Sequence, residues 1–156
     1  MPSPTLIRRA LPSEAEALST LAVRSKAHWG YDEAFLRAVH DDLAITAAQV
    51  EKWIVHALVE EAEVRGFYAL RPVDERTLDL ERLFVDPLAL GRSYGRQLFE
   101  HAVEAARQRG FHQIDIASDP YAEDFYLRLG AKRVGEVPSP IAGRTLPLLR
   151  FDTSPN

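Results

Sequence analysis

The residues best suited to chemistry lie between Val85 and Leu98, where a strand-like segment leads through a glycine-containing loop into a helical pattern. A helix N-terminus offers backbone N–H groups without intrahelical partners and about half a unit of positive charge. Gly91 and Gly95 let a ligand approach the backbone closely, and the arginines at 92 and 96 add positive charge. The pattern predicts a phosphate or pyrophosphate site, although a helix that merely starts after a loop has the same appearance.

The same segment also resembles the serine elbow of α/β-hydrolases. Gly91–Gly95 matches G-x-S-x-G, with Ser93 in the nucleophile position. A hydrolase also needs an acid and then a histidine downstream, but His112 is the last histidine and no plausible strand-end acid precedes it. The segment has neither the Gly-Lys-Ser/Thr of a Walker loop nor the G-x-G-x-x-G of a dinucleotide-binding turn. A serine hydrolase therefore remains a minor alternative.

The elements around this loop predict an α/β fold with a mixed sheet, in the order β-α-α-β-β-β-α-β-α-β-β. Alternating or apolar runs predict strands at Leu6–Ala10, Trp53–Val59, Val64–Arg71, Thr77–Val85, Gln113–Ala117, Lys132–Val137 and Thr145–Phe151. Helices are expected from an N-cap at Ser13 to Gly30, over Glu33–Asp41, from the glycine loop to about Arg109, and from Asp119 to Gly130. The acidic segment Glu60-Glu61-Ala62-Glu63 predicts a hairpin turn, and the faltering alternation at 82–84 predicts a bulge. A capping box is expected between Ser13 and Glu16.

Composition narrows the possible functions. A chain of 156 residues with 46% apolar and 27% charged residues predicts one globular domain over residues 1–156. The net charge of −4 argues against a nucleic-acid partner. Cysteine is absent and the scattered histidines lack metal-ligand spacing, so we expect no disulfide, no thiol nucleophile and no metal. With neither a signal-like N-terminus nor about 18 consecutive apolar residues, we expect a cytoplasmic protein with no membrane partner.

Two segments resemble the motifs of one enzyme family. Residues 86–102 resemble motif A of the GNAT N-acetyltransferase superfamily, Arg/Gln-x-x-Gly-x-Gly/Ala, and keep its final small residue as Gly95. Leu90 stands where Arg or Gln is usual, and Ser93 where the first glycine of the triplet is usual. Both substitutions keep the backbone N–H donors of the loop, and the serine hydroxyl could itself donate a hydrogen bond to a phosphate.

The second segment, residues 118–131, resembles motif B of the same superfamily, Asn-x-x-Ala-x-x-Phe-Tyr-x-x-x-Gly-Phe. Tyr126 and Gly130 are kept, whereas Asp119 replaces the usual Asn and Ala131 the usual Phe. The order of elements over nearly the whole chain also resembles the family. The resemblance therefore implies a GNAT-like mixed sheet, splayed at its centre and flanked by helices.

The resemblance further implies that acetyl-coenzyme A binds between two splayed parallel strands, here Leu78–Val85 and Gln113–Ala117. Backbone groups freed by the splay would pair with the pantetheine arm, and the loop at 91–96 would hold the pyrophosphate. The residues implied in binding this cosubstrate are Leu83, Phe84, Val85, Leu90, Gly91, Arg92, Ser93, Tyr94, Gly95, Arg96, Asp119 and Tyr126.

The implied reaction is direct transfer of the acetyl group to a small-molecule or peptidyl amine. Tyr126, which occupies the motif B tyrosine position, is implied as the acid or hydrogen-bond donor to the departing sulfur. A backbone amide near Leu83 or Phe84 would stabilise the oxyanion. Glu81 is a candidate base acting through water, or a surface carboxylate paired with Arg82.

The acceptor is expected near the loop between the first two helices, where two aromatic residues and a histidine surround a glycine. His28, Trp29 and Tyr31 could line an amine pocket by cation–π contact, with His28 a second candidate base. Trp29 and Tyr31 could equally cap the core beneath the loop. A non-enzyme alternative, an acyl-coenzyme A-binding sensor without turnover, is suggested by the departures at 90, 93 and 119. A homodimer through the Thr145–Phe151 strand also remains open.

Overall fold

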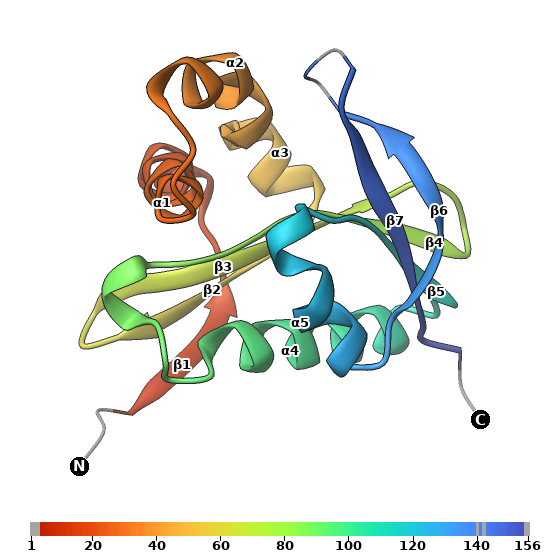
Figure 1. The fold of residues 1–156 in the computed structure, drawn as a ribbon. Helices are drawn as coiled ribbons and strands as arrows, with labels where there is room; N and C mark the ends of the chain where they lie inside the picture. The colour runs from red at the N-terminus through yellow and green to blue at the C-terminus, as the bar shows by residue number, and fades with distance from the viewer. Residues whose placement is uncertain (1–3, 140, 142, 155–156) are drawn as a thin grey trace.

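The computed structural model describes residues 4–139, 141 and 143–154, and its centre is a seven-stranded sheet in the order β1-β2-β3-β4-β5-β7-β6 (Figure 1). The strands are β1 (Thr5–Arg9), β2 (Ile54–Glu60), β3 (Glu63–Pro72), β4 (Thr77–Val85), β5 (Gln113–Ala117), β6 (Lys132–Pro138) and β7 (Thr145–Asp152). The main helices are α1 (Ala15–Ala27), α2 (Glu33–Leu43), α3 (Ala47–Lys52), α4 (Tyr94–Gln108) and α5 (Glu123–Arg128). The mixed α/β fold with a centrally splayed sheet is confirmed.

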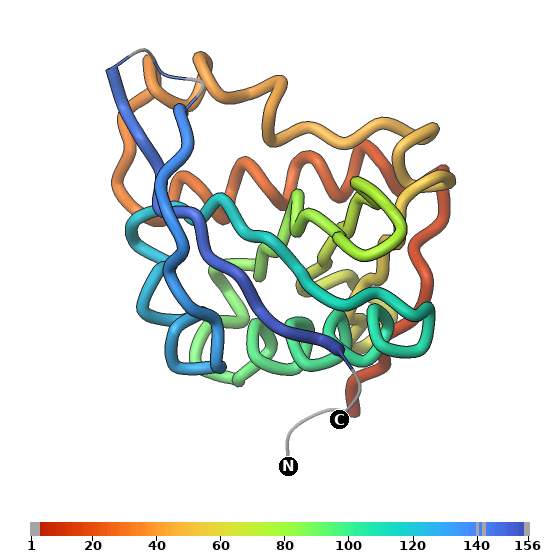
Figure 2. Tube along the Cα trace, turned by 90° about the vertical axis from the view of Figure 1, so that its right-hand side faces the viewer, coloured from red at the N-terminus to blue at the C-terminus, as the bar shows by residue number. Residues whose placement is uncertain are grey.

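Helices cover both faces of this sheet. Figures 1 and 2 show α1, α2 and α3 on one face and α4 on the other, with α5 beside α4. Each face has its own apolar cluster: one joins α1–α3 to side chains such as Phe67, and the other joins α4 and α5 to side chains such as Ile114. The central strands have nearly continuous apolar sequences because helices bury both faces of the sheet.

The centre of the sheet is open at one end. Parallel pairing between β4 and β5 covers only Thr77–Asp79 against Gln113–Asp115, although β4 continues to Val85. The pairing of β4 with β3 shifts register so that Glu81 is an extra residue between the pairs Leu70–Leu80 and Ala69–Arg82. The predicted bulge is thus present, one residue before the expected position. The bulge and the splay leave the end of β4 without a partner on the β5 side.

Three local predictions need correction or addition. The capping box expected at Ser13 and Glu16 is wrong: Glu14 instead accepts the Leu11 N–H at 2.8 Å and pairs with Arg8 at 2.8 Å. Helix α3 was not expected, yet Thr46 and Gln49 cap it reciprocally, which the sequence spells as T-x-x-Q. The expected strand start at Trp53 is the residue that ends α3, and β2 begins at Ile54.

A tight turn connects β2 to β3. Glu61 and Ala62 both have positive φ (52° and 65°), as a tight two-residue hairpin requires, so the predicted turn is confirmed. Strand β7, the strand considered for dimerisation, pairs with β5 on one side and with β6 on the other. The strand proposed for pairing across a homodimer is therefore not an edge, and that route to a dimer is wrong. None of the helices in the described residues combines the length and the hydrophobicity that a membrane-spanning segment needs.

Candidate active site

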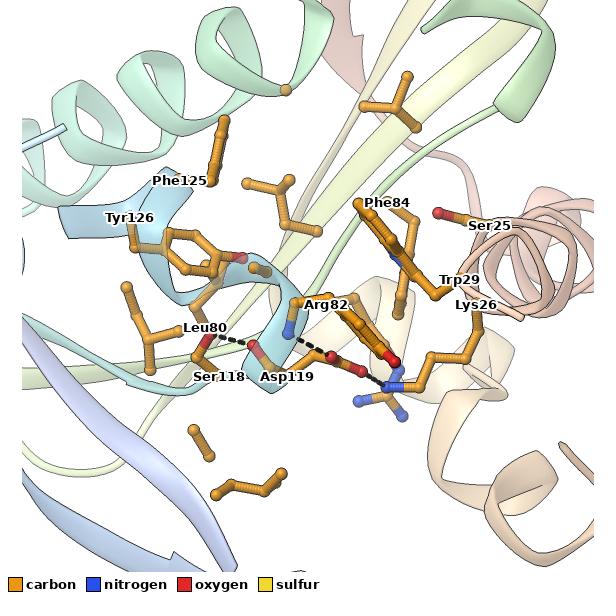
Figure 3. A pocket seen from close by; sticks show the side chains of 18 of the residues that line it. Ser25, Lys26, Trp29, Leu80, Arg82, Phe84, Ser118, Asp119, Phe125 and Tyr126 are labelled. Carbon is orange, nitrogen blue, oxygen red and sulfur yellow. Dashed lines mark hydrogen bonds and ion pairs between the residues drawn. The ribbon is translucent and has the colours of Figure 1, made fainter. Parts of the chain in front are cut away.

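A cavity of about 960 Å³ opens where β4 and β5 diverge. Its walls come from the end of β4, the loop before α4, the junction of β5 with α5, and the α1–α2 and β6–β7 segments (Figure 3). Predicted site residues that line it are Glu81, Leu83, Phe84, Val85, Leu90, Gly91, Ser93, Tyr94, Gly95, Arg96, Asp119, Tyr126 and Trp29. Segments far apart in the sequence thus meet around one space.

The loop before α4 is shaped by two left-handed residues, Gly91 (φ 84°) and Ser93 (φ 63°). Ser93 is the N-cap of α4, and its carbonyl accepts the first intrahelical bond from Gln97 N–H at 3.0 Å. The amides of the first turn consequently lack intrahelical partners and lie at the cavity wall. No described residue hydrogen-bonds the Ser93 side chain, which leaves its hydroxyl available as well. The serine elbow of a hydrolase is not formed, because no histidine lines this cavity among the described residues.

Gly95 lies where α4 and α5 approach each other. A Cβ at this position would lie 3.3 Å from the Phe125 ring and 3.7 Å from Val85. A larger side chain would have to displace the ring or enter the mouth of the cavity. The small residue kept from motif A therefore leaves the first turn of α4 accessible from the cavity.

Glu60 holds the polar ends of two side chains at the start of α4, those of Arg92 and Tyr94. Glu60, at the end of β2 and only 4% exposed, accepts hydrogen bonds from the Tyr94 hydroxyl and from Arg92 Nη1, the latter at 2.9 Å. Arg65 lies 3.5 Å from the same carboxylate. The Tyr94 hydrogen bond lowers the pKa of Glu60, so the carboxylate stays charged and anchors the loop. Arg92 does not line the cavity, and Arg96, which does, pairs with Glu100 at 2.7 Å.

Tyr126 extends from α5 into the cavity (Figure 3). Its ring packs edge-on against Phe99 and Phe125, with centroids 5.6 and 5.1 Å away, and the residue is 7% exposed. Among the described residues, none hydrogen-bonds its hydroxyl. Burial raises the pKa of Tyr126 above its ordinary value, and the charge of Asp119 adds to this. The hydroxyl therefore stays protonated at neutral pH and points into the space where a ligand would lie.

Glu81, the bulged residue of β4, lines the cavity but is not free. Its Oε1 accepts from Arg71 Nε at 2.9 Å, and its Oε2 lies 3.6 Å from Arg82 Nη1. Arg82 is 9% exposed and donates mainly to backbone carbonyls, those of Leu43 (3.1 Å) and Ala44 (2.8 Å) among them. The structure thus contains the pairing of Glu81 with Arg82 that the sequence left open, together with a stronger pairing to Arg71.

The aromatic loop forms part of the opposite wall. Trp29 stacks parallel to Tyr121, with an interplanar angle of 2° and centroids 5.6 Å apart, and both rings are exposed. Tyr31 stacks on Phe35 at 4.0 Å and does not itself line the cavity. His28 contacts the edge of Trp29 and lies outside the lining. Of the three expected acceptor residues, only Trp29 therefore reaches the cavity.

Asp119 connects this loop to α5. It accepts the Tyr121 N–H at 2.9 Å, which confirms its predicted capping position, and it also pairs with Lys26 and accepts from the Tyr31 hydroxyl at 3.0 Å. Burial alone would raise the pKa of Asp119, but hydrogen bonds from Lys26, the Tyr121 amide and Tyr31 outweigh it and lower the pKa. The carboxylate is therefore charged and fully engaged. An anionic residue so placed is not suited to direct contact with a phosphate.

Sequence reasoning missed several lining residues, mainly Lys26, Tyr121, Arg82 and Arg144. Tyr121 lies within the motif B segment and could have been selected as an exposed aromatic at a helix start. Lys26 and Arg144 lie 93 and 25 positions from Asp119, and no motif around either residue indicates that it belongs to the site. No group of three potential metal ligands is present among the described residues.

Comparison with known proteins identifies the family. Residues 15–131 match the model of the Acetyltransferase (GNAT) family. The chain is 32% identical over 132 residues to the 5-NmdU N-acetyltransferase of Pseudomonas phage PaMx11, a match that covers 84% of this chain and 89% of the relative.

Solved structures show the same fold. A GCN5-related N-acetyltransferase from Rhodopseudomonas palustris has a TM-score of 0.80 at 22% identity, covering 97% of this chain and 98% of that one. PaiA N-acetyltransferase from Thermoplasma acidophilum, solved in complex with coenzyme A, has a TM-score of 0.76 at 14% identity, covering 96% and 99%. The resemblance seen in the two motif segments is thus confirmed: the chain belongs to the acetyltransferase (GNAT) family and is an acetyltransferase enzyme.

Proposed function

We propose that this enzyme transfers the acetyl group of acetyl-coenzyme A to a primary amine by direct attack of the amine. The observation that carries the proposal is the splay of β4 from β5 beside the open N-terminus of α4, with Tyr126 in the same cavity. Family membership and a structural neighbour solved with coenzyme A support the same donor.

The residues around the cavity fit this cosubstrate. A long thioester with a nucleotide tail needs an extended groove with backbone partners and an anion site at one end. The end of β4, at Leu83–Val85, has no strand partner on the β5 side and can pair with the amides of the pantetheine arm. The first-turn amides of α4, the Ser93 hydroxyl and Arg96 would hold the pyrophosphate. Arg92 and Tyr94 act indirectly, because Glu60 holds their side chains and thereby the shape of the loop.

Acetyl-coenzyme A supplies an activated acyl group. The protein must convert the acceptor's ammonium group to the neutral amine and stabilise the departing sulfur. A free alkyl ammonium has a pKa of about 10.4, so it must lose a proton first. We assign this step to Glu81, which lines the cavity: Arg71 holds its Oε1, but no described residue hydrogen-bonds its Oε2, and this oxygen would take the proton through water. An amide of β4 near Leu83 or Phe84 would donate to the carbonyl oxygen as charge develops on it.

Tyr126 would donate a hydrogen bond to the sulfur. A thiol has a pKa of about 8.5 and a tyrosine about 10, and burial raises that of Tyr126 further. Complete proton transfer from Tyr126 to the thiolate is therefore uphill. The role of Tyr126 is accordingly that of a permanently protonated donor aimed at developing negative charge.

Tyr126→Phe tests this assignment. The variant should lower kcat by about 10²-fold or more while changing the affinity for acetyl-coenzyme A less than threefold, roughly the limit for loss of a weak contact. Thiol release over a panel of amines measures kcat, and calorimetry measures affinity. Tyr68→Phe is the matched control, since Tyr68 is also buried but hydrogen-bonds His56 and His101 outside the cavity.

Two outcomes would redirect the proposal. Normal turnover by Tyr126→Phe would show that another group assists the departing sulfur. Tight binding of acetyl-coenzyme A by the wild-type protein without thiol release to any amine would instead indicate the sensor without turnover.

A further inference from the structure

One cation at the acceptor end of the cavity has no anionic partner. Arg144, in the β6–β7 segment, lines the cavity and is partly buried. Its Nη2 donates to the Tyr31 hydroxyl at 2.9 Å, and its guanidinium lies 5.0 Å from the Phe35 ring and 5.4 Å from the Tyr31 ring. Among the described residues, no carboxylate lies within 4.0 Å of it. Its contacts are thus to one hydroxyl and two ring faces, and Asp119, which already pairs with Lys26, is connected to it only through the Tyr31 hydroxyl.

The other two cations of this wall are already compensated. Lys26 pairs with Asp119. Arg82 donates to backbone carbonyls and lies 3.6 Å from Glu81. Arg144 is therefore the cation of this wall that keeps unused donors and has no direct anionic partner, within the part of the chain that the structure describes.

The rings beside Arg144 cannot receive the ammonium end of a substrate. Lys26 Nζ lies 5.2 Å from the Tyr31 ring centroid and 5.9 Å from that of Phe35, so two cations already occupy the surroundings of this stacked pair. Asp119 balances one of these cations, so the group keeps a net positive charge and a further ammonium there would be repelled. The amine must instead approach from the side of β4 and Tyr126. The other end of the acceptor molecule then lies next to Arg144.

We propose, on the basis of the proposed function, that the acceptor is an amine whose far end carries an anionic oxygen group, a carboxylate or a phosphate, and that Arg144 binds this group. Arginine is suited to this role because its planar guanidinium can donate two parallel hydrogen bonds to two oxygens of one carboxylate or phosphate. Trp29 and Tyr121 present exposed rings at the same cavity wall, on which a flat spacer between the two ends would pack. Arg144 is thus a specificity-determining residue for the acetyl acceptor.

The test compares amines that differ only in the acidic group. Suitable pairs are 4-(aminomethyl)benzoate with 4-methylbenzylamine, 4-aminobutyrate with butylamine, and O-phosphoethanolamine with ethanolamine. The wild-type enzyme should favour the acidic member of at least one pair by about tenfold in kcat/KM, the effect of one charge-assisted hydrogen bond. The first two pairs report a carboxylate and the third a phosphate.

Arg144→Gln should abolish this preference by raising KM for the acidic amine about tenfold, with KM for acetyl-coenzyme A unchanged and a much smaller change in KM for the neutral amine. Arg144→Lys should retain part of the preference because it keeps the charge. Arg37→Gln, which removes an exposed α2 cation outside the cavity, is the matched control and should change nothing.

Acetylation of both members of every pair with equal efficiency would overturn this inference alone, as would an acid preference that survives in Arg144→Gln. Failure of the wild-type enzyme to acetylate any amine would overturn the proposed function, and this inference with it.

Discussion

Ser93 combines a strained backbone with an unpartnered hydroxyl, and the two properties can be separated by mutation. The residue has φ 63° and ψ 22°, in the left-handed region, where a side chain costs roughly 1 kcal/mol. The family motif has glycine at this position. The strain persists in a loop that we assign to phosphate binding, which suggests that the hydroxyl compensates for it by contacting the ligand.

Ser93→Gly should therefore change stability and affinity in opposite directions. Relief of the left-handed strain gives roughly 1 kcal/mol, and the extra freedom of glycine in the unfolded chain removes about half of it. A net gain of roughly 0.5 kcal/mol corresponds to an increase in Tm of about 1–2 °C for a chain of this size. Loss of a hydrogen bond to a charged phosphate costs about 1.5–3 kcal/mol, which weakens acetyl-coenzyme A binding by roughly 10- to 100-fold.

Calorimetric titration with acetyl-coenzyme A and a thermal melt of the free protein measure the two effects. Ser93→Ala is the matched control: it keeps the strain and loses the hydroxyl, so it should lose affinity without gaining stability. If Ser93→Gly binds acetyl-coenzyme A as tightly as the wild-type protein, the hydroxyl is not a ligand and the loop amides suffice.

Two further predictions concern stability. Gly66→Ala should destabilise the fold by about 1–3 kcal/mol, because a Cβ would lie 2.9 Å from both the Phe84 carbonyl oxygen and Leu98 Cδ1; urea unfolding measures this, and an unchanged midpoint would contradict it. Burial, helped by the charges of His101, Arg109 and Arg9, lowers the pKa of His56 from 6.5 to about 4. Since the unfolded chain binds this proton first, stability should fall as the pH drops from 6.5 to 4, by about 1–2 kcal/mol after allowing for partial exposure. His56→Gln should flatten that part of the stability profile, and an identical profile in the variant would refute the assignment.

The elements were largely predictable because they rest on local patterns. Alternation of apolar residues located all the strands to within a few residues, and the run 60–63 located a turn that the backbone forms with two left-handed residues. The bulge was detectable because the alternation of β4 falters at 82–84, and the extra residue, Glu81, lies just before that point. Helix α3 was missed because its six residues show no clear periodicity, even though its capping box is present in the sequence.

The partners of the site residues were not predictable, because the contacts that fix them join distant parts of the chain. Arg92 was expected to face the phosphate, but Glu60, 32 positions earlier, draws it away from the cavity. Asp119 was expected to contact the cosubstrate, but Lys26, 93 positions earlier, neutralises it. Local sequence gives the type and position of such charges, whereas the sheet order decides which opposite charge they meet.

The central claim is that acetyl-coenzyme A lies between the splayed ends of β4 and β5 with its phosphates at the start of α4. Amide hydrogen exchange, measured with and without acetyl-coenzyme A, tests it most directly. We predict that binding slows exchange at Leu83–Val85 and at the amides of residues 94–96, with little change in β1 and β2. Binding that protects neither segment, or that protects only the distant strands, would contradict the account.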